Sequence, residues 1–275
     1  MTRTIAEKRA AFRALHASGC FILPNPWDVG SARYLASLGF QALATTSSGF
    51  AWTQGLADNH VDREQVLAHL REMVDATHLP INADFENGFA ADADGVFENV
   101  RLAVATGVAG LSIEDSTNDD NAPPQFPIDV AATRIAAARR AIDEAGGEAL
   151  LIGRAEGLLF DQPSLDDTIA RLKAYAAAGA NCLYAPGLKS REQIEAVVRA
   201  VAPKPVNVLV GSNSDFTLQD LAAMGVRRVS IGGALARAAW GGVMRATERL
   251  VEGRFDGFGG NASGAQLNAL FADRD

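Results

Sequence analysis

The sequence predicts a single α/β domain that folds as a (β/α)₈ barrel over residues 1–275, and three observations favour this fold. A glycine that precedes a short apolar run recurs at positions 19, 39, 107, 179 and 225. Glycine suits the residue just past a helix, where the backbone is left-handed, and continuous apolar runs are typical of strands that helices cover. Three further apolar runs complete a set of eight, and a chain of 275 residues suits eight βα units.

The expected strands are all short. They are residues 21–23, 42–44, 80–85, 111–113, 149–155, 182–184, 206–210 and 228–231. The segments between them carry helix signals. Ser190 followed by Gln193 forms a capping box, and Asp62 followed by Gln65 has the same spacing. An open, doubly wound sheet is the alternative that this alternation of strands and helices also allows.

Two segments depart from the alternating pattern. Residues 116–127 are polar and contain prolines, which indicates a mobile loop that could gate a site at the barrel mouth. Residues 234–275 contain an amphipathic helix, expected at 235–251, and a glycine-rich tail. Neither segment has the size of a second domain.

The composition excludes several classes of partner. With 33 acidic and 25 basic residues, the formal net charge is −8, so nucleic acid and anionic membranes are not expected partners. The N-terminal residues lack the apolar core of a signal peptide, and no apolar run is long enough to span a membrane. Two cysteines, Cys20 and Cys182, suit a reduced compartment, although they do not exclude a disulfide. We therefore expect a soluble cytoplasmic protein.

Carboxylates gather at the expected strand ends. Asp84 and Glu86 are two residues apart at the end of one strand, so their side chains should share a face; Glu114 ends the next strand, and Asp58 lies in an earlier loop. Two carboxylates about 5 Å apart repel by about 3 kcal/mol at an effective dielectric near 20. Such a group needs protons or a cation, and oxygen ligands favour Mg²⁺, with Mn²⁺ as the alternative. The competing interpretation is that these acids cap helices or pair with arginines.

One arginine and one small turn add groups that can bind an anion. Arg154 ends the fifth expected strand and suits bidentate capture of a carboxylate or phosphonate, unless it pairs with Glu156 or Glu114. The turn at residues 47–49 offers backbone amides to an oxyanion. The four histidines share no metal-ligand spacing, and only His60 lies near the expected site.

These motifs together resemble the isocitrate lyase/phosphoenolpyruvate mutase superfamily over nearly the whole chain. The resemblance rests on runs at residues 25–28, 47–50, 55–58, 84–89, 112–115 and 225–230. It implies a barrel whose eighth helix is exchanged between subunits, in a homodimer or homotetramer. It also implies site roles: Asp84 would bind Mg²⁺ most directly, while Asp58, Glu86 and Glu114 would hold its waters.

The resemblance further implies a set of residues that bind the substrate. Ser48 and Gly49 would act with Arg154 on its carboxylate or phosphonate, and the catalytic set is Asp58, Arg154 and Ser48. The full substrate-binding set is Ser47, Ser48, Gly49, Phe50, Arg154, Asn207, Ser212 and Asn213.

The chain also departs from the best-known branches. Residues 116–124 lack the Lys-Lys-Cys-Gly-His run of the isocitrate and methylisocitrate lyases and the Lys-x-Asn pattern of the phosphonate mutases. Gly187 stands where those lyases carry a glutamate, and Thr46 stands where the mutase carries a tryptophan. These differences weigh against the standard reactions of both branches.

The prediction is therefore a Mg²⁺-dependent lyase that cleaves or decarboxylates a small 2-oxo or 2-hydroxy dicarboxylic acid, such as oxaloacetate, through an enolate. A hydrolase that uses water activated by the cation is a variant of this prediction. Two alternatives remain: C–P bond chemistry on a phosphonopyruvate-like substrate, and a non-catalytic protein that binds a 2-oxo acid such as 2-oxoglutarate.

Overall fold

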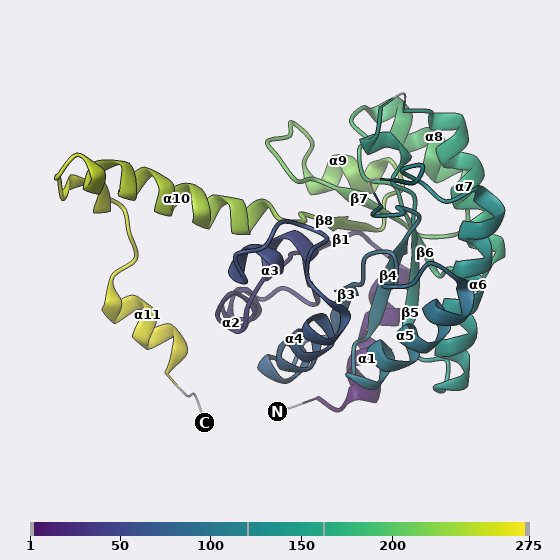
Figure 1. Cartoon of the computed structure of the whole chain (residues 1–275), viewed down its shortest axis with the longest axis horizontal. Helices are drawn as coiled ribbons and strands as arrows, with labels where there is room; N and C mark the ends of the chain where they lie inside the picture. Colours follow the sequence, from purple (N-terminus) through teal and green to yellow (C-terminus); the bar gives the residue numbers. More distant parts are fainter. Residues whose placement is uncertain (1–2, 120, 162, 273–275) are drawn as a thin grey trace.

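Eight parallel strands form one sheet in the order β1-β8-β7-β6-β5-β4-β3-β2, with helices around the outside (Figure 1). The computed structural model describes residues 3–119, 121–161 and 163–272. Because neighbours in the sheet follow the chain order and β1 pairs with β8, the barrel is confirmed and the doubly wound alternative is wrong. The strands are β1 (Phe21–Leu23), β2 (Leu43–Ala44), β3 (Ile81–Asp84), β4 (Gly110–Glu114), β5 (Leu150–Arg154), β6 (Cys182–Tyr184), β7 (Val206–Leu209) and β8 (Arg228–Ser230).

The seam between β1 and β2 is closed without a strand ladder among the described residues. The N–H of Ala44 donates to the carbonyl of Pro24 at 3.0 Å. Asn25 completes the seam, because its amide nitrogen donates to the carbonyl of Thr45 and its amide oxygen accepts from the N–H groups of Ile231 and Gly232. One buried side chain thus joins the ends of β1, β2 and β8 just below the barrel mouth.

The helices begin where the capping signals place them. Side chains of Asp62 and Ser190 cap α4 and α8, and both capping boxes are formed as expected. The helices are α1 (Ile5–Ala17), α2 (Val29–Ser37), α3 (Ser47–Thr53), α4 (Arg63–Ala76), α5 (Ala93–Ala105), α6 (Ile128–Glu144), α7 (Leu165–Ala177), α8 (Arg191–Val201), α9 (Leu218–Ala223), α10 (Ala234–Val251) and α11 (Gly264–Phe271), with short 3₁₀ turns η1 (Gly157–Leu159) and η2 (Asp256–Phe258).

Apolar side chains fill the space between the strands and the helices, whereas the barrel interior is partly polar. The N-terminal end of the interior is closed by Phe12 of α1, which is fully buried and belongs to the same apolar cluster as Phe21 and Leu150. Further up the interior, Asn82, Asn207 and Arg228 are also buried. Buried polar groups need partners or ligands, so this interior is built for polar contacts below the mouth.

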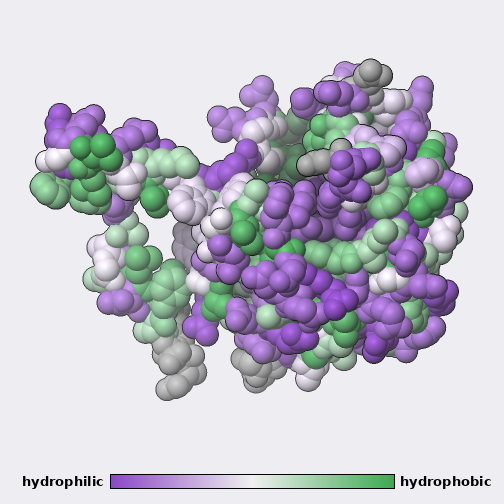
Figure 2. Space-filling view, viewed as in Figure 1, coloured by the Kyte–Doolittle hydropathy of each residue, from purple (hydrophilic) through white to green (hydrophobic). Residues whose placement is uncertain are grey.

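Helix α10 leaves the barrel and projects away from it, and α11 returns beside α2 (Figure 1). Large apolar side chains on this arm are exposed, and apolar patches appear along it in Figure 2. They include Trp240, Val243, Met244 and Val251, the last of them 90% exposed. A surface of this kind is typical of an interface between protein chains.

The segment expected to be a loop is confirmed as one up to α6. Ser116 and Gln125 form an isolated antiparallel bridge, and the N–H of Thr117 donates to the carbonyl of Pro124 at 3.0 Å. Residue 120 lies outside the described residues. No helix in the described part of the chain combines the length and apolar character that a membrane span requires. Cys20 and Cys182 are both free thiols.

Candidate active site

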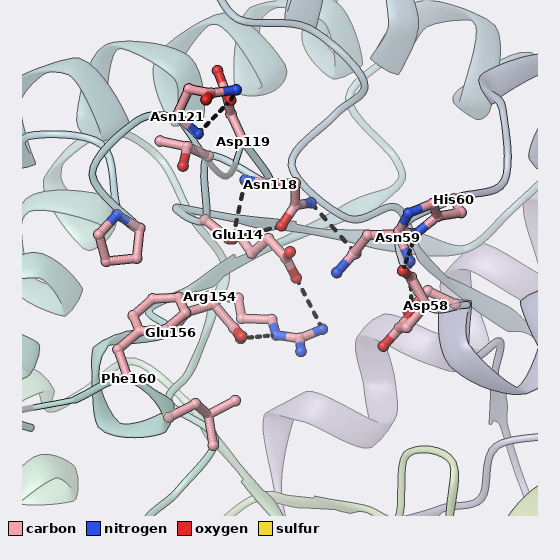
Figure 3. Close-up of a pocket in the computed structure, with 15 residues that line it drawn as sticks. Asp58, Asn59, His60, Glu114, Asn118, Asp119, Asn121, Arg154, Glu156 and Phe160 are labelled. Atoms are coloured by element: carbon pink, nitrogen blue, oxygen red, sulfur yellow. Dashed lines mark hydrogen bonds and ion pairs between the residues drawn. The ribbon is translucent and has the colours of Figure 1, made fainter.

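A pocket of about 660 Å³ opens at the carboxyl ends of the strands (Figure 3). Loops after β2, β4 and β5 surround it, so the site lies at the barrel face where the sequence predicts it. Its lining includes Asp58, His60, Glu114, Arg154 and Glu156. The pocket continues downward into a smaller cavity of about 170 Å³, which shares Ser47, Asp58 and Arg154 with it and also contacts Asp84 and Ser48.

Asp84 is held in place at the end of β3. Its backbone N–H donates to the hydroxyl of Thr45 at 2.9 Å, and its Oδ2 accepts from the backbone N–H of Ser47 at 3.0 Å. Its Oδ1 lies 3.1 Å from a terminal nitrogen of Arg154. These contacts fix the carboxylate before any ligand arrives, which is the preorganisation that a metal ligand needs.

Glu86 reaches the same region by a different route from the expected one. Strand β3 ends at Asp84, and Glu86 has a left-handed backbone with φ of +46°. The argument that the two side chains share one face of a single strand is therefore wrong, because Glu86 lies beyond the strand. A positive φ is strained for a non-glycine residue and is found more often at functional sites. Burial, together with the charges of Asp84 and Asp58, raises the pKa of Glu86 to about 8, so these acids do lie near one another.

Glu114 and Glu156 flank Arg154 (Figure 3). The Arg154 guanidinium lies 3.3 Å from Glu114 and its Nε lies 2.5 Å from Glu156. Burial raises the pKa of Glu114 well above its usual range, and Arg154 only partly offsets this effect. Arg154 thus forms internal salt bridges with both Glu114 and Glu156, as the competing interpretation expected, and with Asp84 as a third partner.

Asp58 lies at the exposed rim of the pocket, in the loop after α3. Its Oδ1 accepts a hydrogen bond from the N–H of Asn59. The surrounding protein and the charge of Asp84 nevertheless raise the pKa of Asp58. A carboxyl group with a raised pKa that faces the pocket can take up and release a proton there.

The donor set fits a hard divalent cation that is bound largely through water. Within the described residues, no three acidic, histidine or cysteine side chains are close enough to hold one ion directly. Mg²⁺ usually keeps several waters and takes only one or two protein carboxylates. Acids outnumber bases here, because Asp58, Asp84, Glu86 and Glu114 share one arginine, Arg154. The raised pKa values of Glu86 and Glu114 mean that ionising these acids is unfavourable without a cation. A bound dication would offset this repulsion.

The four consecutive candidates at residues 47–50 form the first turn of α3, where the sequence indicated a loop turn. The hydroxyl of Thr46 caps the helix by accepting from the N–H of Gly49, and it also contacts the Ser48 hydroxyl at 3.2 Å. Ser47 and Ser48 both line the inner cavity. Phe50 does not join them, because its ring stacks on His69 with centroids 3.9 Å apart.

The candidates within and after β7 are not brought to this pocket. Asn207 is fully buried in the barrel interior, where it donates to the Ser230 hydroxyl and accepts from Arg228. Ser212 and Asn213 line a neighbouring pocket of about 680 Å³. That pocket shares Leu159 with the one above the acids.

Several lining residues escaped the sequence prediction. Asn59 and Asn118 come from two different loops, and the amide nitrogen of Asn118 donates to the amide oxygen of Asn59 at 3.4 Å. Both have positive φ angles, +64° and +51°, a conformation that asparagine adopts more readily than most residues. Leu159 and Phe160 add an apolar wall after β5. No spacing in the sequence signals these four residues.

Asp115 follows Glu114 but has a structural role. Its carboxylate is almost fully buried and accepts hydrogen bonds from the Tyr175 hydroxyl at 2.5 Å and from Arg171 at 3.1 Å. It also accepts from the backbone N–H of Glu156 at 2.9 Å. Asp115 therefore fixes the loop that carries Glu156 rather than facing the pocket.

Gly187 explains one departure from the related lyases. Its φ is +94°, and a Cβ at this position would come within 2.8 Å of the Leu158 side chain. The η1 turn therefore occupies the space that a side chain after β6 would need. A glutamate from this position cannot enter the site without moving η1.

These features define a barrel of the isocitrate lyase/phosphoenolpyruvate mutase class, with an acidic mouth crossed by one arginine. A sequence profile of the phosphoenolpyruvate phosphomutase family matches residues 12–251. The chain belongs to the phosphoenolpyruvate phosphomutase family, which confirms the resemblance drawn from the motifs.

Three known proteins show how the chain relates to others of this class. A putative lyase/mutase from Burkholderia cenocepacia is 47% identical, with a TM-score of 0.93 and 98% of each chain covered. An oxaloacetate decarboxylase from Rhodopseudomonas palustris is 32% identical over 82% of this chain and 78% of its own length. A phosphonopyruvate hydrolase, solved with oxalate and Mg²⁺, is 24% identical with a TM-score of 0.85, covers 98% of this chain and 95% of its own, and shares the fold.

Proposed function

We propose that the protein is a Mg²⁺-dependent carbon–carbon lyase that cleaves or decarboxylates a small 2-oxo or 2-hydroxy dicarboxylic acid, with oxaloacetate as the first candidate. The observation that carries this proposal is the convergence of Asp84 and Glu114 on Arg154 at the barrel mouth. Glu86 is buried close enough for the Asp84 charge to raise its pKa. The oxaloacetate decarboxylase relatives support the substrate class.

Each residue has a distinct task in this proposal. Asp84 would hold the cation, and Asp58, Glu86 and Glu114 would bind its waters. The bound Mg²⁺ would act as a Lewis acid toward the oxo oxygen of the substrate. Mn²⁺ would serve the same donor set.

The arginine then has to change partners. Arg154 is shared among Asp84, Glu114 and Glu156. Asp84 and Glu114 contact the same terminal nitrogen, Nη1. Once a cation and its waters take up the charge of these two acids, Nη1 would become available to a substrate carboxylate, while Nε keeps its contact with Glu156. The Ser48 hydroxyl and the first turn of α3 would bind the same carboxylate.

The bond-breaking step needs a place for negative charge and a source of a proton. When the carbon–carbon bond of a 2-oxo acid breaks, its electron pair moves toward the oxo oxygen and gives an enolate. Arg154 would stabilise that charge. Asp58 would then return a proton to carbon, because it faces the pocket and its pKa is raised.

A second candidate function is C–P bond chemistry on a phosphonopyruvate-like substrate. The name of the matching family favours it, as does a putative phosphonomutase from Burkholderia cenocepacia that is 36% identical with a TM-score of 0.81. Against it stand the loop after β4, which lacks a lysine, and Thr46.

One experiment separates these functions. The purified protein is incubated with Mg²⁺ and a panel of 2-oxo acids, 2-hydroxy acids and phosphonates, and pyruvate, CO₂ and phosphate are followed together. Mg²⁺-dependent release of pyruvate and CO₂ from oxaloacetate supports the lyase. Release of phosphate from phosphonopyruvate alone selects C–P chemistry. Binding of 2-oxoglutarate or oxalate without turnover of any compound selects the non-catalytic alternative and rejects both reactions.

The assembly and location of the protein are also proposals. The exposed apolar face of α10 supports exchange of this helix between subunits in a homodimer or homotetramer. The two free thiols suit the reduced cytoplasm.

A further inference from the structure

The inner cavity reaches one layer deeper than the acids at the mouth. Its lining runs from Asp84 at the end of β3 to Arg228 at the start of β8. Arg228 pairs in register with Asn207, two residues before the ends of β7 and β8. Two residues along a strand correspond to about 6.6 Å. The Arg228 side chain therefore forms part of the floor of the cavity whose top is the proposed metal site.

Arg228 carries a buried charge with only amide partners. The residue is 2% exposed, its Nε donates to the amide oxygen of Asn207 at 2.8 Å, and a terminal nitrogen lies 3.5 Å from the amide oxygen of Asn82. Among the described residues, no carboxylate lies within 4.0 Å of its guanidinium. Burial lowers the pKa of Arg228, yet a guanidinium stays protonated in proteins.

The titratable groups around Arg228 are neutral. Burial and the Arg228 charge hold the pKa of His16, on α1 below it, at about 3. Burial raises the pKa of Tyr184 to about 12 and also raises that of Cys182, so both side chains on β6 stay protonated. The Nε2 atom of His16 is buried and has no partner among the described residues. The floor thus carries one positive charge, and a buried charge without a counterion is unfavourable unless a ligand supplies one.

The two arginines of the cavity differ in the number of carboxylate partners that each already has. Arg154, at the mouth, is shared by three carboxylates. Arg228 meets none, and the Ser230 hydroxyl and the Asn82 amide lie beside it along the same cavity. A planar donor next to hydroxyl and amide groups is suited to a carboxylate.

We propose that Arg228 is a specificity-determining residue whose guanidinium binds, from below, the carboxylate that the substrate keeps after bond cleavage. This inference rests on the proposed function. In a decarboxylation, the departing carboxylate gives its bonding electron pair to the carbon that remains and leaves as CO₂, and a proton later replaces it on that carbon. An arginine bound to the departing group would stabilise its charge before the bond breaks and slow the step. The carboxylate over Arg228 is therefore the one retained in the 2-oxo acid product, and it is the same carboxylate that Arg154 and Ser48 would bind from the mouth side of the cavity.

Equilibrium binding of the product class tests this assignment without turnover. Calorimetry in Mg²⁺ compares pyruvate with pyruvamide, in which a neutral amide replaces the carboxylate. Arg228→Met should weaken pyruvate binding by at least about tenfold, the loss expected for a charged hydrogen bond, and leave pyruvamide binding nearly unchanged. Arg101→Met, on an arginine whose side chain is 55% exposed, is the matched control and should change neither.

Several results would overturn the assignment. Equal loss of both ligands in Arg228→Met means that the arginine only supports the barrel, and unchanged pyruvate binding means that it does not meet the carboxylate. Arg228→Gln keeps a donor for Asn207 and provides a second neutral variant if the methionine variant unfolds; failure of both to fold assigns the residue to the framework alone. Chloride that stabilises the wild type against heat, without competing with pyruvate, would show that the floor holds an inorganic anion.

The test also separates this inference from the proposed function. If no compound in the substrate panel turns over, but Arg228→Met still discriminates between pyruvate and pyruvamide, the lyase proposal fails and the carboxylate site stands. If oxaloacetate is decarboxylated but Arg228→Met weakens pyruvate and pyruvamide binding equally or not at all, the lyase proposal stands and the carboxylate site at Arg228 is rejected.

Discussion

The backbone N–H of Ser47 donates a hydrogen bond of 3.0 Å to Oδ2 of Asp84, so the first turn of α3 and the end of β3 are held together at the barrel mouth. This contact leaves Oδ1 of Asp84 facing Arg154. The carboxylate therefore has one oxygen fixed by the framework and the other available for exchange between an arginine and a cation.

Asp84→Ala should abolish Mg²⁺-dependent turnover while the barrel stays folded. Loss of an outer partner of a metal site costs about 10- to 100-fold, and a direct ligand should cost more. Arg154 keeps Glu114 and Glu156 as partners in the variant, which protects the fold. Pyruvate release and thermal unfolding with and without Mg²⁺ are the measurements. Asp94→Ala, on a side chain that is 97% exposed, is the control; wild-type turnover in Asp84→Ala would remove the metal from the mechanism.

Glu86 should make the metal-free protein less stable as pH rises. The unfolded chain releases this proton near the ordinary pKa of 4.5, whereas the folded protein keeps it to about 8. Between these values the folded state binds more protons than the unfolded state, so stability is present at the acidic end and is lost toward pH 8, by up to about 1.4 kcal/mol per pH unit. Burial raises the pKa of Glu114 in the same direction.

Urea denaturation in EDTA between about pH 5 and about pH 8 measures this slope. Glu86→Gln should flatten it, because glutamine does not titrate, while Glu98→Gln on an exposed side chain should leave it as in the wild type. An unchanged slope in Glu86→Gln would mean that Glu86 is ionised in the folded protein.

Tyr175→Phe should lower stability without lowering activity to the same degree. The tyrosine hydroxyl donates to Asp115 at 2.5 Å, and a hydrogen bond to a charged group is worth about 1.5–3 kcal/mol. Arg171 still holds Asp115 in the variant, so Glu156 should stay in place. Chemical denaturation and kcat/KM are compared with Tyr34→Phe, on a tyrosine that is 47% exposed. A large loss of kcat with little loss of stability would give Tyr175 a role in the reaction.

Charges placed on the apolar face of α10 should dissociate the protein. Val243 and Met244 are 52% and 59% exposed, and Val243→Asp combined with Met244→Lys introduces charges that an apolar interface cannot bury cheaply. Light scattering should show the wild type as a dimer or tetramer and this variant as a monomer. Val130→Asp on α6, at a position 39% exposed, should keep the wild-type mass. A monomeric wild type would reject helix exchange.

The fold was predictable from the sequence because its signals are local. The glycine-strand pattern places five strands and separate apolar runs place the other three, while the capping boxes place two helix starts, all within a few residues. The acids at the mouth were predictable because strand ends in a barrel must meet. The left-handed backbone of Glu86 was not, since nothing in its neighbours requires it. The positions of the Asn207 and Phe50 side chains depend on contacts with Arg228 and His69. These partners lie farther along the chain, and no motif in the sequence links them.

The projecting arm of α10 should make the stability of the fold depend on protein concentration as well as on temperature. Its apolar side chains, with Val251 90% exposed, contact water in an isolated chain. If neighbouring chains cover them, dilution alone removes that stabilisation, and the midpoint of heat unfolding should rise with protein concentration. At the low protein concentrations used in enzyme assays, the folded fraction would then depend on the association equilibrium as well as on the sequence of the chain.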